Sequence, residues 1–127
     1  MSNLNHCRAI VTISTIEGYA NGAYAVGWNM NDFCITLQVI GENAFGDSYI
    51  SWVVTPGKAI YKSAWGAPKG GEDIFVLTAD YTEYDKGIDI HEWKNRVFKY
   101  AEYLKNYFKQ ETVRVTFING VETTVVR

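Results

Sequence analysis

The sequence lacks most features by which metal-dependent and nucleic-acid-binding proteins are recognised. Its 127 residues include two cysteines and two histidines. Cys7 and Cys34 have no CxxC or metal-ligand spacing, and His6 and His91 lie far apart, so we expect no metal site. No run of like charges is present and the net charge is −2. Because electrostatic binding of nucleic acid needs a basic stripe, we expect no nucleic-acid partner.

The sequence also has no long apolar run and no signal peptide, so we expect a cytoplasmic protein without a membrane partner. A chain of this length forms one domain, which we place at residues 1–127. Aromatic residues are abundant, with nine Tyr and four Trp. They are consistent either with a sheet packed by large rings or with an aromatic pocket or interface.

Short segments rich in β-branched residues predict most of the secondary structure. Residues 17–31 link the first two of these segments, and their three glycines oppose the short crossover helix that could form there. The second segment is apolar on both faces and is expected at the centre of the sheet. A turn at Thr55-Pro56-Gly57 is expected to end the third segment. The four predicted strands are residues 8–15, 32–40, 48–54 and 73–81.

One long amphipathic helix is predicted from about Ile90 to Lys109. Its apolar residues recur at spacings of three and four, and Asp89 with Glu92 resembles a capping box at its start. Beyond it, residues 112–117 alternate, Asn119-Gly120 is a hairpin turn, and residues 121–126 are expected to pair back. The pattern predicts an α+β fold in which one long helix covers an antiparallel sheet. A second, short helix within residues 18–30 would make it a ferredoxin-like sandwich.

The predicted loop at residues 58–72 is the candidate functional segment, since rigid scaffolds display chemistry on such loops. Tyr61 and Glu72 stand at its two ends, so they can meet across its base. Gly70-Gly71 allows close approach to the backbone, while Trp65 and Pro68 offer flat apolar surface. A carboxylate beside aromatic rings suits a small cation with an aromatic portion. A solvated turn with no ligand is the alternative.

Two motifs support a family resemblance over residues 60–117. The first comprises Tyr61-Lys62, Ala64, Ala67-Pro68 and Glu72, which lies eleven positions after the tyrosine. The second is Gln110-Glu111, between an aromatic helix end and an alternating strand. In this order the motifs resemble the bacteriophage enzymes that destroy S-adenosylmethionine (SAM), long called SAM hydrolases and now SAM lyases. Trp65 and Gly70-Gly71 depart from the family pattern.

The resemblance implies a function, an assembly and a site. It implies cleavage of SAM to 5′-methylthioadenosine and homoserine lactone without a cofactor, in a homotrimer with active sites between subunits. In the host cytoplasm this would deplete the methyl donor of restriction systems. The implied catalytic residues are Tyr61 and Glu72; the implied substrate-binding residues are Trp65, Ala67, Pro68, Phe75 and Glu111. For adenine stacking, Tyr49 is a further alternative to Trp65 and Phe75.

Two other functions fit the same composition. One is a phage inhibitor or a protein that sequesters a nucleotide signal, which would also be small, acidic and aromatic. The other is a structural or immunity-type partner that uses its rings as an interface. Formation of methylthioadenosine from SAM separates the enzyme from both.

Overall fold

The computed structural model describes residues 6–17, 27–82, 85 and 87–126. Its sheet has the strand order β2-β3-β1-β4, and every neighbouring pair is antiparallel. The main elements follow the order β-α-β-β-α-β, which is the ferredoxin-like arrangement. This confirms the predicted α+β fold. The elements are β1 (Cys7–Ser14), α1 (Met30–Ile40), β2 (Val53–Ala59), β3 (Glu72–Tyr81), α2 (Ile90–Tyr107) and β4 (Arg114–Asn119).

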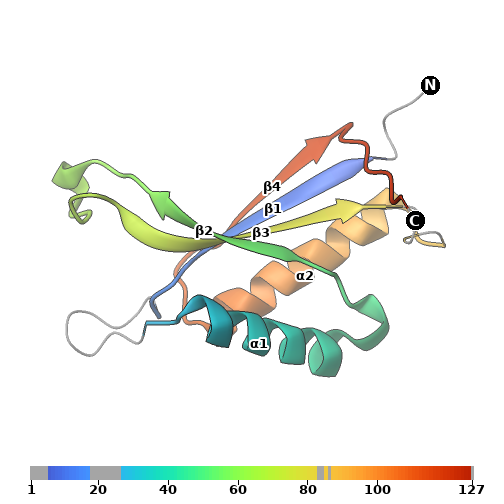
Figure 1. Cartoon of the computed structure of the whole chain (residues 1–127), viewed down its shortest axis with the longest axis horizontal. Coiled ribbons are helices and arrows are strands. Elements are labelled where there is room, and N and C mark those ends of the chain that lie inside the picture. Colours follow the sequence, from blue (N-terminus) through green and yellow to red (C-terminus); the bar gives the residue numbers. More distant parts are fainter. Residues whose placement is uncertain (1–5, 18–26, 83–84, 86, 127) are drawn as a thin grey trace.

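Both helices lie on the same side of the sheet (Figure 1). Residues alternate between the two faces along a strand, and in β1 every second residue, from Cys7 to Ile13, is buried. These residues share one core with β3 residues such as Leu77 and with the apolar stripes of the two helices. The residues between them, such as Thr12, lie on the other face, which none of the helices in the described ranges covers. The β2–β3 hairpin extends beyond the rest of the sheet (Figure 1).

The prediction of a strand at residues 32–40 is wrong, because this segment forms α1. Its buried residues are Phe33, Leu37 and Ile40, spaced by four and three as on one face of a helix. The side chain of Asn29 caps the helix by accepting a hydrogen bond from the backbone N–H of Asp32 at 2.8 Å. The short crossover helix considered at residues 18–30 falls largely on residues 18–26, which lie outside the described residues.

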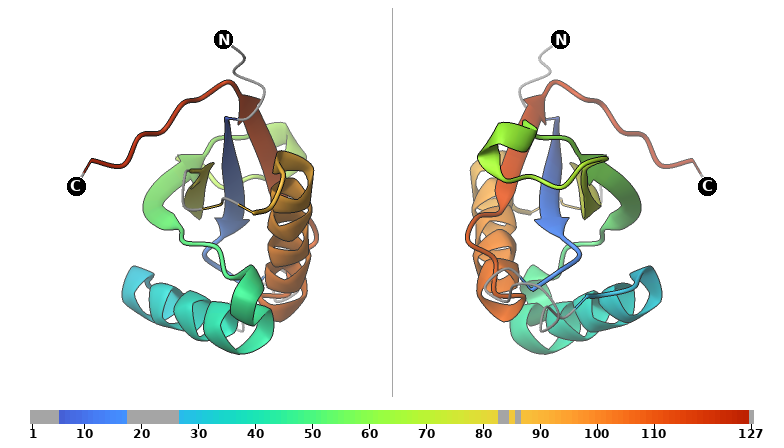
Figure 2. Two further views of the ribbon diagram at one scale, coloured as in Figure 1. Left: turned by 90° about the vertical axis from the view of Figure 1, so that its right-hand side faces the viewer. Right: turned by 90° about the vertical axis from the view of Figure 1, so that its left-hand side faces the viewer.

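Two further boundaries differ from the prediction. Residues 48–52 of the strand predicted at 48–54 lie outside β2, and the expected terminator Thr55-Pro56-Gly57 lies inside it. Proline is tolerated there because β2 is an edge strand. Residues 121–126 form no strand, so the C-terminal hairpin is absent. Figure 2 shows this segment leaving the sheet instead of pairing with β4.

The long helix is confirmed as α2. Asp89 is its N-cap, and its side chain accepts a hydrogen bond from the backbone N–H of Glu92 at 2.8 Å. The helix ends at Tyr107, two residues before the predicted end. Lys109 has a φ of 53°, in the left-handed region that stops a helix.

Tyr100 of α2 joins the helix to the chain that enters β2. Its side chain is 1% exposed, and its hydroxyl oxygen accepts a hydrogen bond from the backbone N–H of Ile50 at 3.0 Å. Its ring stacks on Phe45 with centroids 3.9 Å apart. Burial raises the pKa of the Tyr100 hydroxyl.

We predict that Tyr100→Phe lowers the free energy of unfolding by about 1–2 kcal/mol, because it leaves a buried backbone N–H without a partner. Tyr103→Phe is the matched control, since Tyr103 is 40% exposed on the same helix and its change should stay within about 0.5 kcal/mol. Urea denaturation of both variants measures the difference. Equal effects would contradict the structural role assigned to the Tyr100 hydroxyl.

Candidate active site

A cavity of about 650 Å³ lies at the end of the sheet beside the β2–β3 hairpin. Its volume falls within the range of roughly 300–1,000 Å³ typical of small-molecule sites. Four segments line it: the end of β1, the end of β2 with the hairpin loop, the start of β3, and residues 110–114 after α2. Thr12, Ser14 and Ile74 line it from the sheet face that no helix covers.

The β2–β3 hairpin places Tyr61, Pro68 and Glu72 on this cavity. Ala59 and Glu72 are the last paired residues at the base of the hairpin, so Glu72 stands where the loop re-enters the sheet. Gly71 makes this base possible. Its φ is +94°, and a Cβ atom there would lie 2.4 Å from the Ile60 side chain and 3.0 Å from the Ala59 carbonyl oxygen.

Gln110 fixes the opposite wall of the cavity. It is 4% exposed, although glutamine is usually a surface residue. Its side-chain Nε2–H donates to the carbonyl oxygens of Ile16 at 2.9 Å and Phe108 at 3.0 Å, and its Oε1 accepts from the backbone N–H of Ser14 at 3.3 Å. The amide thereby joins the end of β1 to the end of α2. Glu111, the next residue, lines the cavity.

Five charged residues line the cavity: Glu17, Lys58, Glu72, Glu111 and Arg114. Lys58 forms an ion pair with Asp73 at 2.8 Å, and Glu17 forms one with Lys109 at 3.7 Å. Within the described part of the chain, the other three charged residues have no ion-pair partner. The cavity therefore offers two carboxylates and one guanidinium to a ligand.

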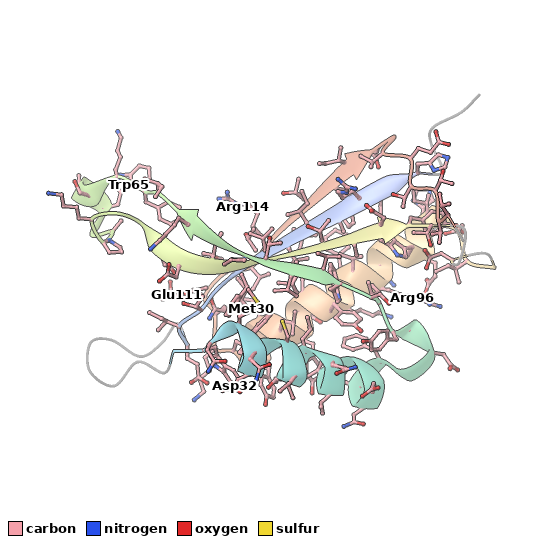
Figure 3. All side chains as sticks on the ribbon, viewed as in Figure 1. Met30, Asp32, Trp65, Arg96, Glu111 and Arg114 are labelled. Atoms are coloured by element: carbon pink, nitrogen blue, oxygen red, sulfur yellow. The ribbon has the colours of Figure 1, made fainter. Side chains whose placement is uncertain are left out.

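The remaining predicted site residues lie elsewhere. Phe75 is 3% exposed and stacks on Phe33 in the core, with ring centroids 4.3 Å apart, so it does not line the cavity. Trp65 is 71% exposed at the tip of the hairpin, and neither it nor Ala67 lines the cavity (Figure 3). Tyr49 contacts the turn after α1, where Gly41 lies close to its ring.

Sequence reasoning missed Glu17, Lys58 and Arg114 as cavity residues. The alternation of residues 112–117 did contain a signal for Arg114, since it placed this residue on the polar side of a strand. No comparable signal existed for Lys58, which was assigned to a loop. Glu17 follows the end of β1, and its position on the cavity depends on the path of the chain after that strand.

The cavity wall has three carboxylates and two cationic side chains. Among the described residues, no group of three or more His, Cys, Asp or Glu side chains is placed to hold a metal ion. No helix within the described residues has the length and apolar character needed to cross a membrane. Both cysteines are free thiols, and burial raises the pKa of Cys7. The polar side chains on the cavity wall include carboxylates, a phenol, a guanidinium, an amine and hydroxyl groups.

The fold matches two solved structures of phage enzymes. One is a phage SAM lyase in complex with S-methyl-5′-thioadenosine, with a TM-score of 0.63 and 16% identity over 91% of this chain and 82% of that one. The other is a phage SAM lyase in its apo state, with a TM-score of 0.60 and 14% identity over 90% and 80% of the two chains. No curated protein matches the sequence closely enough to count as a relative.

The chain thus shares the fold of the phage SAM lyases, which are enzymes that act on a small molecule. A family model described as SAM lyase matches residues 7–125. The chain belongs to the SAM lyase family and is an enzyme of that class.

We predict that Gln110→Ala lowers the free energy of unfolding by about 1–3 kcal/mol, because the carbonyl of Ile16 and the N–H of Ser14 lose their bonds to its side-chain amide. Gln38→Ala on the exposed side of α1 is the control and should change stability by less than about 0.5 kcal/mol. Urea denaturation compares the two variants. A Gln110 variant as stable as the control would show that the amide does not fix this wall.

Proposed function

We propose that this enzyme cleaves SAM to 5′-methylthioadenosine and homoserine lactone in the cavity beside the β2–β3 hairpin. The observation that supports this most directly is that one cavity is lined by Tyr61, Glu72 and Glu111. These residues come from the two motifs that resemble the family, and Tyr61 and Glu111 are 50 positions apart in the sequence. The family assignment supports the choice of SAM as substrate.

The proposed reaction needs neither a metal nor a covalent enzyme intermediate. The carboxylate oxygen of SAM attacks the γ-carbon of its own methionine portion and forms the C–O bond of the lactone. The bond between that carbon and sulfur breaks, and its electron pair stays on sulfur, which leaves as the neutral thioether. The enzyme has to hold the methionine portion bent for attack, and such orientation can contribute on the order of 7–11 kcal/mol.

In this proposal Glu72 contacts the cationic part of the substrate. Its side chain is half-buried at the hairpin base, where a carboxylate interacts more strongly with a cation than it would in bulk water. Tyr61 lines the same cavity and orients Glu72 or the bent methionine portion. Pro68 and Glu111 contribute the neighbouring surface, with Glu111 placed for the ribose or the ammonium group.

We also propose a homotrimer with active sites between subunits. The support is the sheet face that no helix covers, which has apolar side chains at Ile10, Ile74 and Val76. Val53 and Ile118 extend this face and are 66% and 42% exposed. Contiguous apolar surface of this kind marks interaction sites. Because the cavity lies at one end of the same face, a neighbouring subunit would cover part of it.

The biological role that we propose is depletion of SAM in the cytoplasm of a phage-infected cell. Restriction and modification systems that use this methyl donor would then be deprived of it. This role rests on the resemblance to the phage enzymes and on the proposed reaction.

We predict that Glu72→Gln reduces the rate of methylthioadenosine formation from SAM at least a hundredfold, because the carboxylate is lost while the shape of the side chain is kept. Chromatography with mass detection measures the product, and homoserine lactone should precede homoserine at early times. Glu102→Gln on the exposed side of α2 is the control and should keep the wild-type rate. Wild-type turnover in the Glu72 variant would remove this residue from the site, and stoichiometric SAM binding without product would favour a sequestering protein.

For the assembly, we predict that Val76→Lys converts the trimer to monomer, since it puts a charge in the centre of the uncovered sheet face. Light scattering coupled to size-exclusion chromatography gives the mass in solution. Ile35→Lys is the control, because Ile35 is 53% exposed on α1, on the helical side of the molecule. A wild-type mass of about 14.4 kDa, or dissociation by both variants alike, would refute this assembly.

A further inference from the structure

The charges available in the cavity match those of the methionine portion of SAM. This portion has an ammonium group, a sulfonium and a carboxylate, which are two positive charges and one negative charge. Among the described residues that line the cavity, the charges without an ion-pair partner are those of Glu72, Glu111 and Arg114, which are two negative charges and one positive charge. The two sets are complementary in sign and in number.

We propose that Arg114 is the positioning residue that binds the substrate carboxylate. This inference rests on the proposed function and deepens it by assigning the group that holds the nucleophile. Lys58 is the other cation on the cavity wall, but Asp73 already neutralises it at 2.8 Å. Arg114 is therefore the cation available to an incoming anion.

The position of Arg114 in the sheet suits this role. It opens β4 directly opposite Thr12, so it stands on the same uncovered face as Ile74 and Glu72. Thr12 lies opposite Arg114 on one side and opposite Val76 on the other, and Val76 is four residues from Glu72 along β3. The Cα atoms of Arg114 and Glu72 are therefore about 16 Å apart by standard strand geometry. Both side chains line the same cavity. Figure 3 shows Arg114 over the sheet, well away from Arg96 at the far end of the molecule.

The guanidinium can hold the carboxylate without removing the nucleophile. One carboxylate oxygen accepts the charge-assisted hydrogen bonds of the guanidinium. The other oxygen stays free to form the bond to the γ-carbon, while the carbon–sulfur bond breaks and its electron pair goes to sulfur. These hydrogen bonds keep the carboxylate beside Arg114, and the second oxygen is left to attack the γ-carbon.

Binding of two unreactive nucleosides tests this assignment. S-adenosylhomocysteine retains the carboxylate but has no sulfonium, and S-methyl-5′-thioadenosine lacks the whole amino-acid portion. For Arg114→Gln we expect calorimetry to show an affinity for S-adenosylhomocysteine ten- to a hundredfold below wild type, in line with the loss of one charge-assisted contact. The affinity for S-methyl-5′-thioadenosine should not change. With SAM as substrate, KM should rise by a similar factor, and Arg114→Lys should restore part of the loss.

Arg96→Gln is the matched control, because it removes an arginine that pairs with Glu92 on α2 at 3.4 Å. It should leave both affinities at wild-type values. If Arg114→Gln lowers the affinity for both nucleosides equally, or for neither, then Arg114 does not bind the carboxylate. It is then a charged residue that protects an edge strand. If neither nucleoside binds the wild-type enzyme, the proposed function itself fails, so the two failures are distinguishable.

Discussion

The packing of both helices on one side of the sheet is the constraint on which the candidate active site depends. Because strand residues alternate between faces, each strand contributes one set of side chains to the core and another to the uncovered face. In β3 this separates Phe75, which packs in the core, from its neighbour Ile74, which lines the cavity. Most residues that line the cavity therefore lie outside the core, with Ile13 and Gln110 as the buried exceptions.

Two local features turn an open sheet face into a cavity. Gly71 lets the base of the β2–β3 hairpin close, since any side chain there would collide with Ile60. On the other side, the buried amide of Gln110 holds the end of β1 against the end of α2 and presents Glu111. Both features fix the position of the cavity wall, as a reaction that depends on substrate orientation requires.

Much of the fold could be predicted from the sequence, because α2, β1, β3 and β4 have clear periodicities. The segment that forms α1 could not, since Ile35 and Val39 make its exposed side apolar and so conceal the helical spacing of Phe33, Leu37 and Ile40. The end of β2 was misplaced because Pro56 reads as a terminator, although an edge strand accepts it. The hairpin signal at Asn119-Gly120 was correct for a turn, but residues 121–126 form no strand.

For the site, the two sequence motifs contain some of the residues that line the cavity. The cavity residues that the strand pairing brings together were missed. Tyr61, Pro68, Glu72 and Glu111 were found from the two motifs. Arg114 and Glu17 reach the cavity only because the strand register brings β4 and β1 together, and no spacing in the sequence shows that register.

A crystal structure of the enzyme with S-methyl-5′-thioadenosine tests the central claim most directly. The account predicts that the nucleoside lies on the uncovered sheet face beside the β2–β3 hairpin, with Glu72 and Tyr61 in contact with it. A nucleoside bound instead on the helical side, for example in the groove between Ile35 and Tyr107, would contradict the account.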